Sequence, residues 1–345
     1  MNHDKKIFFS GIVLIFFCLF FAYFFYISRP TGANQYILKV SKGDGVGTIS
    51  RTLNSNGLIR SRIAFEVWSI FTGNAHKLKP GIYDLNGDLS MFQVINLLVS
   101  GPPDLRILIS EGKNIFEIQD KLSDLGISGE NGGFEVDLGK LQEKYPFLSG
   151  ASDLEGFLFP DTYNLSQGSS LDYFFSTSLT NFSDKALPDF SENEKLIRYL
   201  NGEEPSIYQV LKMASIIEKE VPNHEDRLLV SGILWKRYLL GIPFQVDSSV
   251  VYAKCLNLRR RGEDYTRCNY LNRGDFKLDS KYNTYLNLGF PPTPISNPGE
   301  DAIIAALNPK KSAFLYYLSD PKSKKTVFSK TFEEHNVNRQ KYLNL

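Results

Sequence analysis

The chain has 345 residues, of which 42% are hydrophobic and 22% charged, so its composition is that of a globular protein with room for two or three packed units. Its 39 basic and 38 acidic residues nearly cancel, which argues against a nucleic-acid partner bound through overall charge. The basic cluster 259–261 is too short to change this expectation. The four histidines lack metal-ligand spacing, so we expect no metal site and no cofactor.

Residues 7–27 form an almost uninterrupted apolar run, long enough as a helix to span roughly 30 Å. We expect a single transmembrane helix there, after a cytoplasmic tail at residues 1–6 and before a polar linker at residues 28–34. A cleaved signal peptide is the alternative, but no small-x-small cleavage pattern precedes Ser28. The short N-terminal side favours a cytoplasmic N-terminus, which would leave the rest of the chain outside the cytoplasm.

An internal repeat follows the linker, because residues 40–59 can be aligned with residues 109–127 at one constant offset. Each copy predicts a strand, a glycine turn, an amphipathic helix and a glycine C-cap. The intervening segment is predicted to add two helices and a strand, at residues 61–71, 90–99 and 80–85. Residues 35–104 resemble the LysM module of glycan-binding proteins, although two short β-α units can also be similar by chance.

From residue 105 onward, strands and helices interleave without a Rossmann or P-loop glycine pattern, so the expected fold class is α+β. The predicted strands cover residues 105–109, 244–246, 314–318 and 326–329. The clearest predicted helices cover residues 208–221, 225–240 and 300–307, and a last helix opens at the capping box Thr331–Glu334.

One glutamate in the helix predicted at residues 208–221 is unusual. At about 100° per residue, Glu218 falls on an apolar side of this helix, whereas Glu220 points to the opposite side. A carboxyl group in such a position needs a dedicated partner, or it is kept partly neutral by desolvation and becomes a proton donor. Glu218 is therefore our candidate catalytic acid, and the alternative is a carboxylate at the edge of the stripe, paired with a lysine or an arginine.

A second group of carboxylates lies in residues 153–163, where Glu155 and Asp161 flank an aromatic run. Aromatic rings beside carboxylates suit a sugar-binding cleft, because the rings offer flat apolar surfaces and the acids accept hydrogen bonds from hydroxyls. A turn whose phenylalanines belong to the core explains the same pattern. The stiff or polar segments 245–247, 282–285 and 289–299 either shape a ligand site or merely connect other elements.

Two cysteines, Cys255 and Cys268, lie beyond the apolar run. They could close a short loop in an oxidising compartment, or they could remain as two free thiols.

The motifs in the C-terminal half resemble those of the YceG-like family of endolytic murein transglycosylases. The matching residues occur in the family's order: Glu218-Lys-Glu220, Arg227, Arg237, Gln245-x-Asp247, Tyr282-Asn-Thr-Tyr285, Gly289-x-Pro-Pro292, Ile295, Asn297-Pro-Gly299 and Glu334-His-Asn336. Residues 154–163 resemble another family signature. The resemblance implies a bacterial inner-membrane enzyme with its catalytic domain, residues 105–345, in the periplasm.

The same resemblance implies roles for individual residues. Glu218 would be the catalytic acid, and the residues expected to line the substrate cleft are Glu155, Gln245, Asp247, Asn283 and Tyr285. The implied activity is that of a lyase which cuts the MurNAc-β-1,4-GlcNAc bond of nascent glycan strands, leaves 1,6-anhydro-MurNAc ends and so terminates strand elongation. The expected partners are peptidoglycan strands, the membrane and peptidoglycan synthases.

A single well-placed acid suits this chemistry. A hydrolase with two carboxylates needs its second group to activate water or attack the sugar, whereas a lytic transglycosylase uses the C6 hydroxyl of its own substrate. The alternatives are a membrane-tethered glycan-binding or assembly factor without catalytic activity, and a conventional hydrolase.

Overall fold

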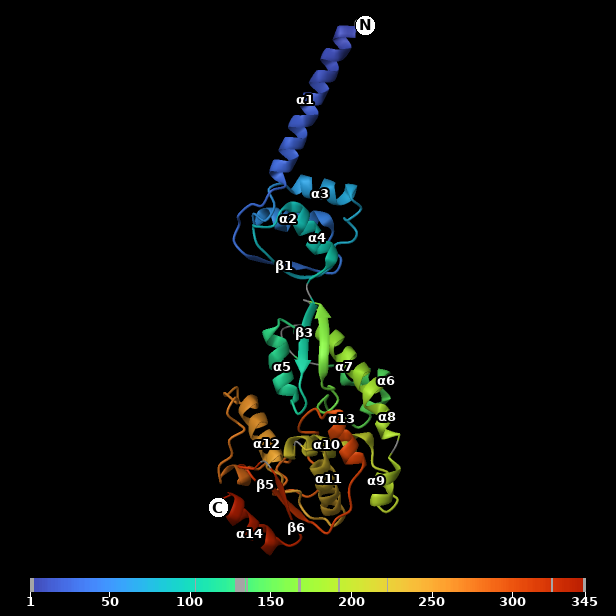
Figure 1. Ribbon diagram of the computed structural model, residues 1–345, viewed down its shortest axis with the longest axis vertical. Helices are drawn as coiled ribbons and strands as arrows, with labels where there is room; N and C mark the ends of the chain where they lie inside the picture. Colours follow the sequence, from blue (N-terminus) through green and yellow to red (C-terminus); the bar gives the residue numbers. More distant parts are fainter. Residues whose placement is uncertain are drawn as a thin grey trace. The chain divides into compact units, whose positions relative to one another are not determined.

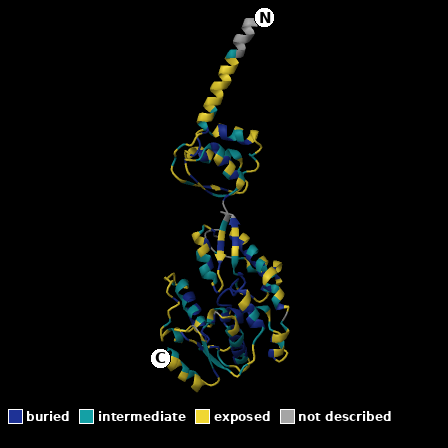
Figure 2. Cartoon of the chain, viewed as in Figure 1, coloured by how far each residue is buried: buried dark blue, intermediate teal, exposed yellow. Residues whose placement is uncertain are grey.

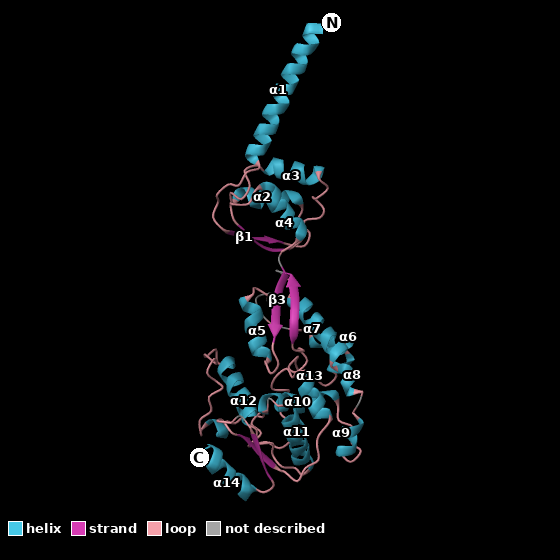
Figure 3. Cartoon of the chain, viewed as in Figure 1, coloured by secondary structure: helices cyan, strands magenta, loops and turns pink. Residues whose placement is uncertain are grey.

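The computed structural model describes residues 3–343, apart from residues 103, 128–133, 135, 167, 168, 192, 222 and 324 (Figure 1). For residues 3–10, 104 and 166 only the backbone is described, and residues 1 and 2 of the predicted tail lie outside the described part. Helices alternate with short strands along the chain (Figure 3), so the predicted α+β class is confirmed. The chain divides into two compact units: Met1–Arg106 with Asn164–Ser170, and Ile107–Tyr163 with Leu171–Leu345.

The first unit packs short helices against a two-stranded sheet. Its elements are α1 (His3–Ile27), β1 (Tyr36–Val40), α2 (Val46–Ser55), α3 (Arg62–Phe71), β2 (Gly81–Leu85) and α4 (Met91–Ser100). In the antiparallel pair β1–β2, Leu38 lies opposite Tyr83, and both side chains are buried. Alternate strand residues face the core because side chains in a strand point to opposite faces in turn. There they pack with buried helix residues such as Leu53, Phe65 and Leu98.

Serine caps set the starts of two of these helices. Ser61 accepts a hydrogen bond from the Ala64 N–H, and Ser90 forms a capping box with Gln93. The helices predicted at residues 61–71 and 90–99 are confirmed, and each begins one residue later because its serine is the N-cap.

α1 carries the apolar run predicted to cross a membrane. Its described side chains begin at Gly11, and large apolar residues between Ile12 and Tyr26 are exposed (Figure 2). Among the described residues, no helix meets the length and hydropathy that a membrane span requires.

The second unit is centred on α10 (Ile207–Glu220), which packs against α11 (His224–Leu239), α12 (Asp247–Arg260) and α13 (Glu300–Leu307). Around these helices lie α5 (Ile115–Asp124), α6 (Leu138–Lys144), α7 (Leu171–Lys185), α8 (Leu187–Phe190), α9 (Glu194–Tyr199), α14 (Phe332–Leu343) and short 3₁₀ turns at Pro146–Leu148 and Asp275–Lys277. β3 (Asp104–Ile109) pairs with β4 (Asp161–Ser166), and β5 (Tyr316–Ser319) pairs with β6 (Thr326–Ser329).

The internal repeat is visible in the backbone. β1 and α2 in the first copy, and β3 and α5 in the second, follow the predicted order of strand, turn and helix. Gly57 and Gly126 end the two helices with φ of 71° and 72°. This left-handed conformation favours glycine at a helix C-terminus, so the aligned glycines have a structural reason.

One predicted strand is wrong. Residues 244–246 do not form a strand, because Gln245 has a φ of 53° and Val246 is the N-cap of α12. α12 itself was not among the predicted helices. Cys255, on α12, is bonded to Cys268 in a disulfide with a sequence separation of 13 residues. Closing a loop of this size restricts the unfolded chain and typically stabilises a protein by about 2–4 kcal/mol.

Candidate active site

Glu218 lies in the last turn of α10, and its side chain is only 6% exposed. Its Oε1 forms an ion pair with the Arg227 guanidinium at 2.7 Å, and its Oε2 accepts a hydrogen bond from the Gly299 N–H at 3.0 Å. Gly299 is the N-cap of α13, where the helix dipole also favours a negative charge. The carboxylate is thus held from both sides by groups that attract negative charge.

The apolar residues expected beside Glu218 on α10, such as Ala214 and Ile217, are buried, and Glu218 has a charged partner among them. α10 is buried on nearly all sides, and the residue beside Glu218 that decides its environment is Arg227, which belongs to the next helix. Arg227 also donates from Nε to the carbonyl of Val221, the C-cap of α10. It therefore fixes the end of α10 and the carboxylate together. A dedicated partner was one of the arrangements expected for Glu218, and the structure contains it as a buried ion pair.

Glu111 is a second carboxyl group beside Glu218, and it was not among the predicted site residues. A Cβ built on Gly299 would lie 2.2 Å from Glu111 Oε1, so this carboxyl group packs directly on the glycine whose N–H binds Glu218. Burial raises the pKa of Glu111, and the negative charge of Glu218 raises it further, while Arg227 acts in the opposite direction. The residue as a whole remains exposed.

Two buried residues, Glu155 and Asn297, form hydrogen bonds that fix the segment leading to Gly299. Glu155 accepts from the Ile115 N–H at the start of α5, from Asn297 Nδ2 at 3.0 Å and from the Tyr252 hydroxyl at 3.0 Å. Asn297 in turn accepts from the backbone N–H groups of Gly156 and Leu158. The segment that continues to Gly299 is thereby fixed to α5 and to residues 155–158.

Two residues predicted to line the cleft have no access to solvent. Glu155 and Asn283 are both 0% exposed. Burial raises the pKa of Glu155 well above its usual range, although the Ile115 N–H opposes the shift. Asn283 donates to the carbonyls of Phe276 and Leu278 and so holds its own loop. These two predictions are corrected, since both residues support the site from within.

The other three predicted residues lie together at the surface of the same unit. Gln245 Oε1 accepts from Arg237, and its N–H bonds to the Thr284 carbonyl. The Tyr285 hydroxyl donates to Asp247 Oδ1 at 2.6 Å. The positive φ of Gln245 is rare for a residue with a side chain and is held here by these contacts. Gln245 and Asp247 are exposed, so this cluster is accessible to a ligand.

Glu220 connects this surface cluster to the end of α10 that carries Glu218. It accepts from the Ser248 hydroxyl at 2.7 Å and from the Tyr317 hydroxyl at 3.0 Å. Burial raises the pKa of Glu220, and the charge of the adjacent Asp247 adds to this shift.

The raised pKa of Glu220 predicts a pH effect on stability. Protonated Glu220 contributes fully below its ordinary pKa of 4.5, and the contribution is lost as the pH rises toward the higher folded pKa. We expect Glu220→Gln, which cannot titrate, to gain stability relative to the wild type above pH 4.5, by up to about 1.4 kcal/mol per pH unit. Urea unfolding at several pH values measures this difference. If the free energies of unfolding of the two proteins differ by the same amount at every pH, the prediction is wrong.

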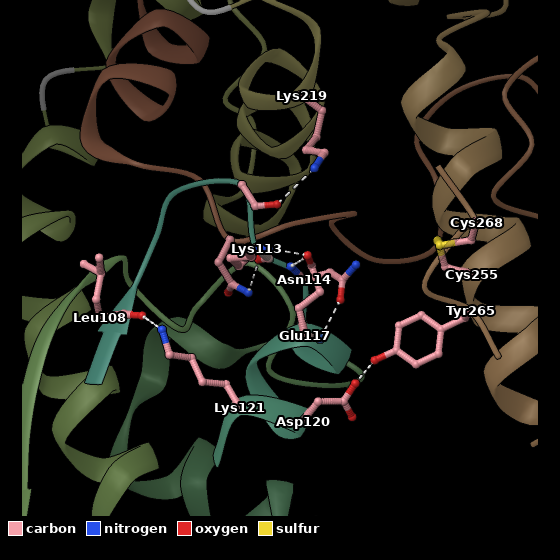
Figure 4. Close-up of polar contacts among 12 residues, drawn as sticks. Leu108, Lys113, Asn114, Glu117, Asp120, Lys121, Lys219, Cys255, Tyr265 and Cys268 are labelled. Carbon is pink, nitrogen blue, oxygen red and sulfur yellow. Dashed lines mark hydrogen bonds and ion pairs between the residues drawn. A yellow bond between two sulfur atoms is a disulfide. The ribbon is translucent and has the colours of Figure 1, made fainter. Parts of the chain in front are cut away.

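Polar contacts hold α5 and the turn before it to neighbouring helices and loops (Figure 4). Lys219 Nζ donates to the Gly112 carbonyl at 3.2 Å, which links α10 to the glycine turn before α5. In the middle of α5, Asp120 accepts from the Tyr265 hydroxyl and pairs with Arg259 at 2.8 Å. Arg259, part of the basic cluster noted in the sequence, therefore has an acidic partner within the chain.

Sequence reasoning missed Glu111 and the direct role of Gly299. Gly299 was part of a recognised motif, but only its contact with Glu218, 81 residues away in the sequence, gives it a function at the site. In the described part of the chain, no group of three or more His, Cys, Asp or Glu residues could hold a metal ion.

Comparisons with known proteins place these residues in a family context. The model of the YceG-like family matches residues 38–341 of the chain. An endolytic murein transglycosylase of Bacillus subtilis is 29% identical over 322 residues, covering 89% of this chain and 84% of that protein. An endolytic murein transglycosylase of Streptococcus pneumoniae is 27% identical and matches 91% of this chain, which spans only 60% of the pneumococcal protein.

A solved structure supports the fold. The crystal structure of a yceG-like protein from Listeria monocytogenes superimposes with a TM-score of 0.55 and 26% identity, over 89% of this chain and 99% of that one.

Proposed function

The chain belongs to the YceG-like family, as its motifs predicted, and we propose that it is an endolytic lytic transglycosylase of peptidoglycan, a lyase. It cleaves the MurNAc-β-1,4-GlcNAc bond within nascent glycan strands, leaves 1,6-anhydro-MurNAc ends and so terminates elongation. The observation that supports this most strongly is the position of Glu218. The residue that matches the family's catalytic acid is held by Arg227 and by the Gly299 N–H at the end of the buried helix α10.

In the proposed reaction, Glu218 acts twice. It first donates a proton to the glycosidic oxygen as the bond to C1 breaks. Its carboxylate then takes the proton of the C6 hydroxyl as the bond from O6 to C1 forms. Between the two transfers Glu218 is negatively charged, and Arg227 and the Gly299 N–H stabilise that charge. No water is consumed.

The carboxyl group of Glu111 accounts for the presence of a proton close to the positively charged Arg227. Two carboxyl groups next to one guanidinium favour retention of one proton by the pair. The raised pKa of Glu111 fits this arrangement. We propose that Glu111 keeps the proton while Glu218 is paired with Arg227, and that the pair shares it when a strand binds.

Removing the Glu111 carboxyl should therefore change the pH profile of cleavage. Glu111→Gln removes the group with the raised pKa that retains the shared proton, so the loss of activity on the alkaline side should move to lower pH. Gly299→Ala should shift the profile in the same direction, because its Cβ would displace the Glu111 carboxyl. Initial rates measured between about pH 4 and pH 8, a range spanning the usual carboxyl pKa values, test this. Unchanged profiles in both variants would contradict the shared proton.

The exposed cluster of Gln245, Asp247 and Tyr285 is proposed to bind the sugar hydroxyls of the strand, because it offers amide, carboxylate and phenol groups side by side. It is linked to α10 through the Glu220–Ser248 hydrogen bond. A glycan strand bound at this cluster would therefore be held at a defined position relative to the turn of α10 that carries Glu218.

We also propose that the apolar run at residues 7–27 anchors the chain in the bacterial inner membrane by a single span, with the enzyme on the periplasmic side. The exposed apolar side chains of α1 support this, since such a surface is costly in water. Residues 35–104 are proposed to be a LysM-like region and residues 105–345 the catalytic domain. Peptidoglycan synthases are the proposed protein partners.

The function is tested by digesting purified peptidoglycan with the full chain and separating the products by mass. Long internal fragments with anhydro ends are expected. Fragments with ordinary reducing ends would identify a hydrolase, and the absence of cleavage with retained binding would identify a glycan-binding factor.

A further inference from the structure

α3 in the first unit is apolar on two sides. Its inner side contributes the buried residues Ala64 and Phe65 to the core. Its outer side carries four exposed apolar side chains, which we call the α3 stripe: Ile63, Val67, Ile70 and Phe71. Phe71 is 79% exposed and Ile63 is 73% exposed. Their spacing places them along one side of the helix.

Such a stripe is unusual on a helix that faces only water. Burying large aliphatic and aromatic side chains is favourable, and apolar surface that stays exposed commonly marks an interaction site. The stripe contains no hydrogen-bonding side chain, so it does not suit a sugar strand, whose hydroxyls need polar partners. An apolar partner fits it better.

The position of the stripe beside α1 indicates which apolar partner this is. Phe24 of α1 packs on Trp68 of α3, with ring centroids 5.4 Å apart, and Trp68 packs on Phe71 at 6.0 Å. An apolar surface therefore continues from the end of α1 to the α3 stripe. Figure 1 shows α3 lying across the end of α1.

Charged groups near the start of α3 suit the same partner. Arg60 lies just before the helix, with its guanidinium 5.4 Å from the centre of the Tyr26 ring, and it is exposed. Arg62, the first residue of α3, is paired with Glu66 at 2.6 Å, so Arg60 supplies the charge for this partner. An apolar helix side bordered by an arginine and aromatic rings is typical of a helix lying in the interface of a membrane with anionic lipids.

We propose that α3 lies flat on the surface of the membrane that α1 enters, with the α3 stripe inserted among the anionic lipid headgroups. This inference rests on the proposed membrane anchor. It gives the first unit two attachments to the membrane, α1 and α3. The two together fix the orientation of the unit relative to the bilayer, which a single helix followed by a linker would leave free.

The test uses the full chain reconstituted into vesicles of phosphatidylethanolamine and anionic phosphatidylglycerol. In a Cys18→Ser background, which leaves the disulfide in place, an environment-sensitive fluorophore is attached at Phe71→Cys. The matched control is Lys39→Cys, an exposed position on β1, which lies on the side of the unit away from α1 (Figure 1). Lipids with a quencher near the headgroup should quench the label at position 71 several-fold more than the label at position 39.

A further variant adds Ile63→Asp and Ile70→Asp to the labelled chain. Both positions are exposed, so the fold should be retained, while quenching at position 71 should fall to the control level. Flotation with the vesicles measures the anchor separately. Equal, weak quenching at positions 71 and 39 in chains that float would overturn the α3 proposal and leave the anchor intact. Chains that do not float would overturn both, and quenching that depends on protein concentration but not on quencher lipid would assign the stripe to a second copy.

Discussion

Glu218→Gln is expected to reduce cleavage of peptidoglycan by about 10²–10⁴-fold, the usual contribution of a general acid and base, while the fold is retained. Glutamine keeps the shape of the side chain and an oxygen that can accept from the Gly299 N–H, but it cannot donate a proton to the glycosidic oxygen. Product release from purified peptidoglycan measures the rate, and circular dichroism checks the fold.

Glu220→Gln is the matched control, because Glu220 lies on the same turn of α10 and is also partly buried. Its hydroxyl partners Ser248 and Tyr317 can accept as well as donate, so they tolerate an amide. We expect this variant to keep activity within about tenfold of the wild type, in contrast to a lost general acid. Equal losses in the two variants would contradict the assignment of the acid to Glu218.

Arg227→Met is expected to lower the free energy of unfolding by about 3–5 kcal/mol, because it leaves the Glu218 carboxylate buried without its ion pair. It also removes the hydrogen bond to the Val221 carbonyl at the end of α10. Cleavage should fall as well, since the anion formed during the reaction loses its main stabilising charge. Urea unfolding and initial rates measure the two effects.

Two comparisons separate these effects. Adding Glu218→Gln to Arg227→Met should restore part of the lost stability, because no unpaired charge remains, but it should restore no activity. Arg259→Met breaks a more exposed ion pair with Asp120, and its cost in stability should be below about 1 kcal/mol. An Arg227→Met protein as stable as Arg259→Met would contradict the buried pairing.

The sequence predicted those features that depend on neighbouring residues. The helix expected at residues 90–99 is α4, and Gly57 and Gly126 marked the ends of α2 and α5, because caps act within one turn of a helix. The order of the family's motifs also indicated Glu218, Gln245 and Asp247 as candidate site residues.

Features that depend on distant contacts could not be predicted in this way. Glu155 was expected at a surface, but contacts with residues 115, 252 and 297 bury it completely. The extended segment expected around Gln245 is bent by its bonds to Arg237 and Thr284. Glu111 was missed because only folding brings it onto Gly299. Helical periodicity assigned a side to Glu218 but could not reveal Arg227 as its partner.

The proposed reaction cleaves glycan strands with a single acid and without water. Digestion of peptidoglycan in water enriched in heavy oxygen, followed by mass spectrometry of the new ends, tests it most directly. We expect 1,6-anhydro-MurNAc ends that carry no heavy oxygen, and their absence in Glu218→Gln. Reducing ends that contain heavy oxygen would contradict it, because they would show that water attacks the sugar.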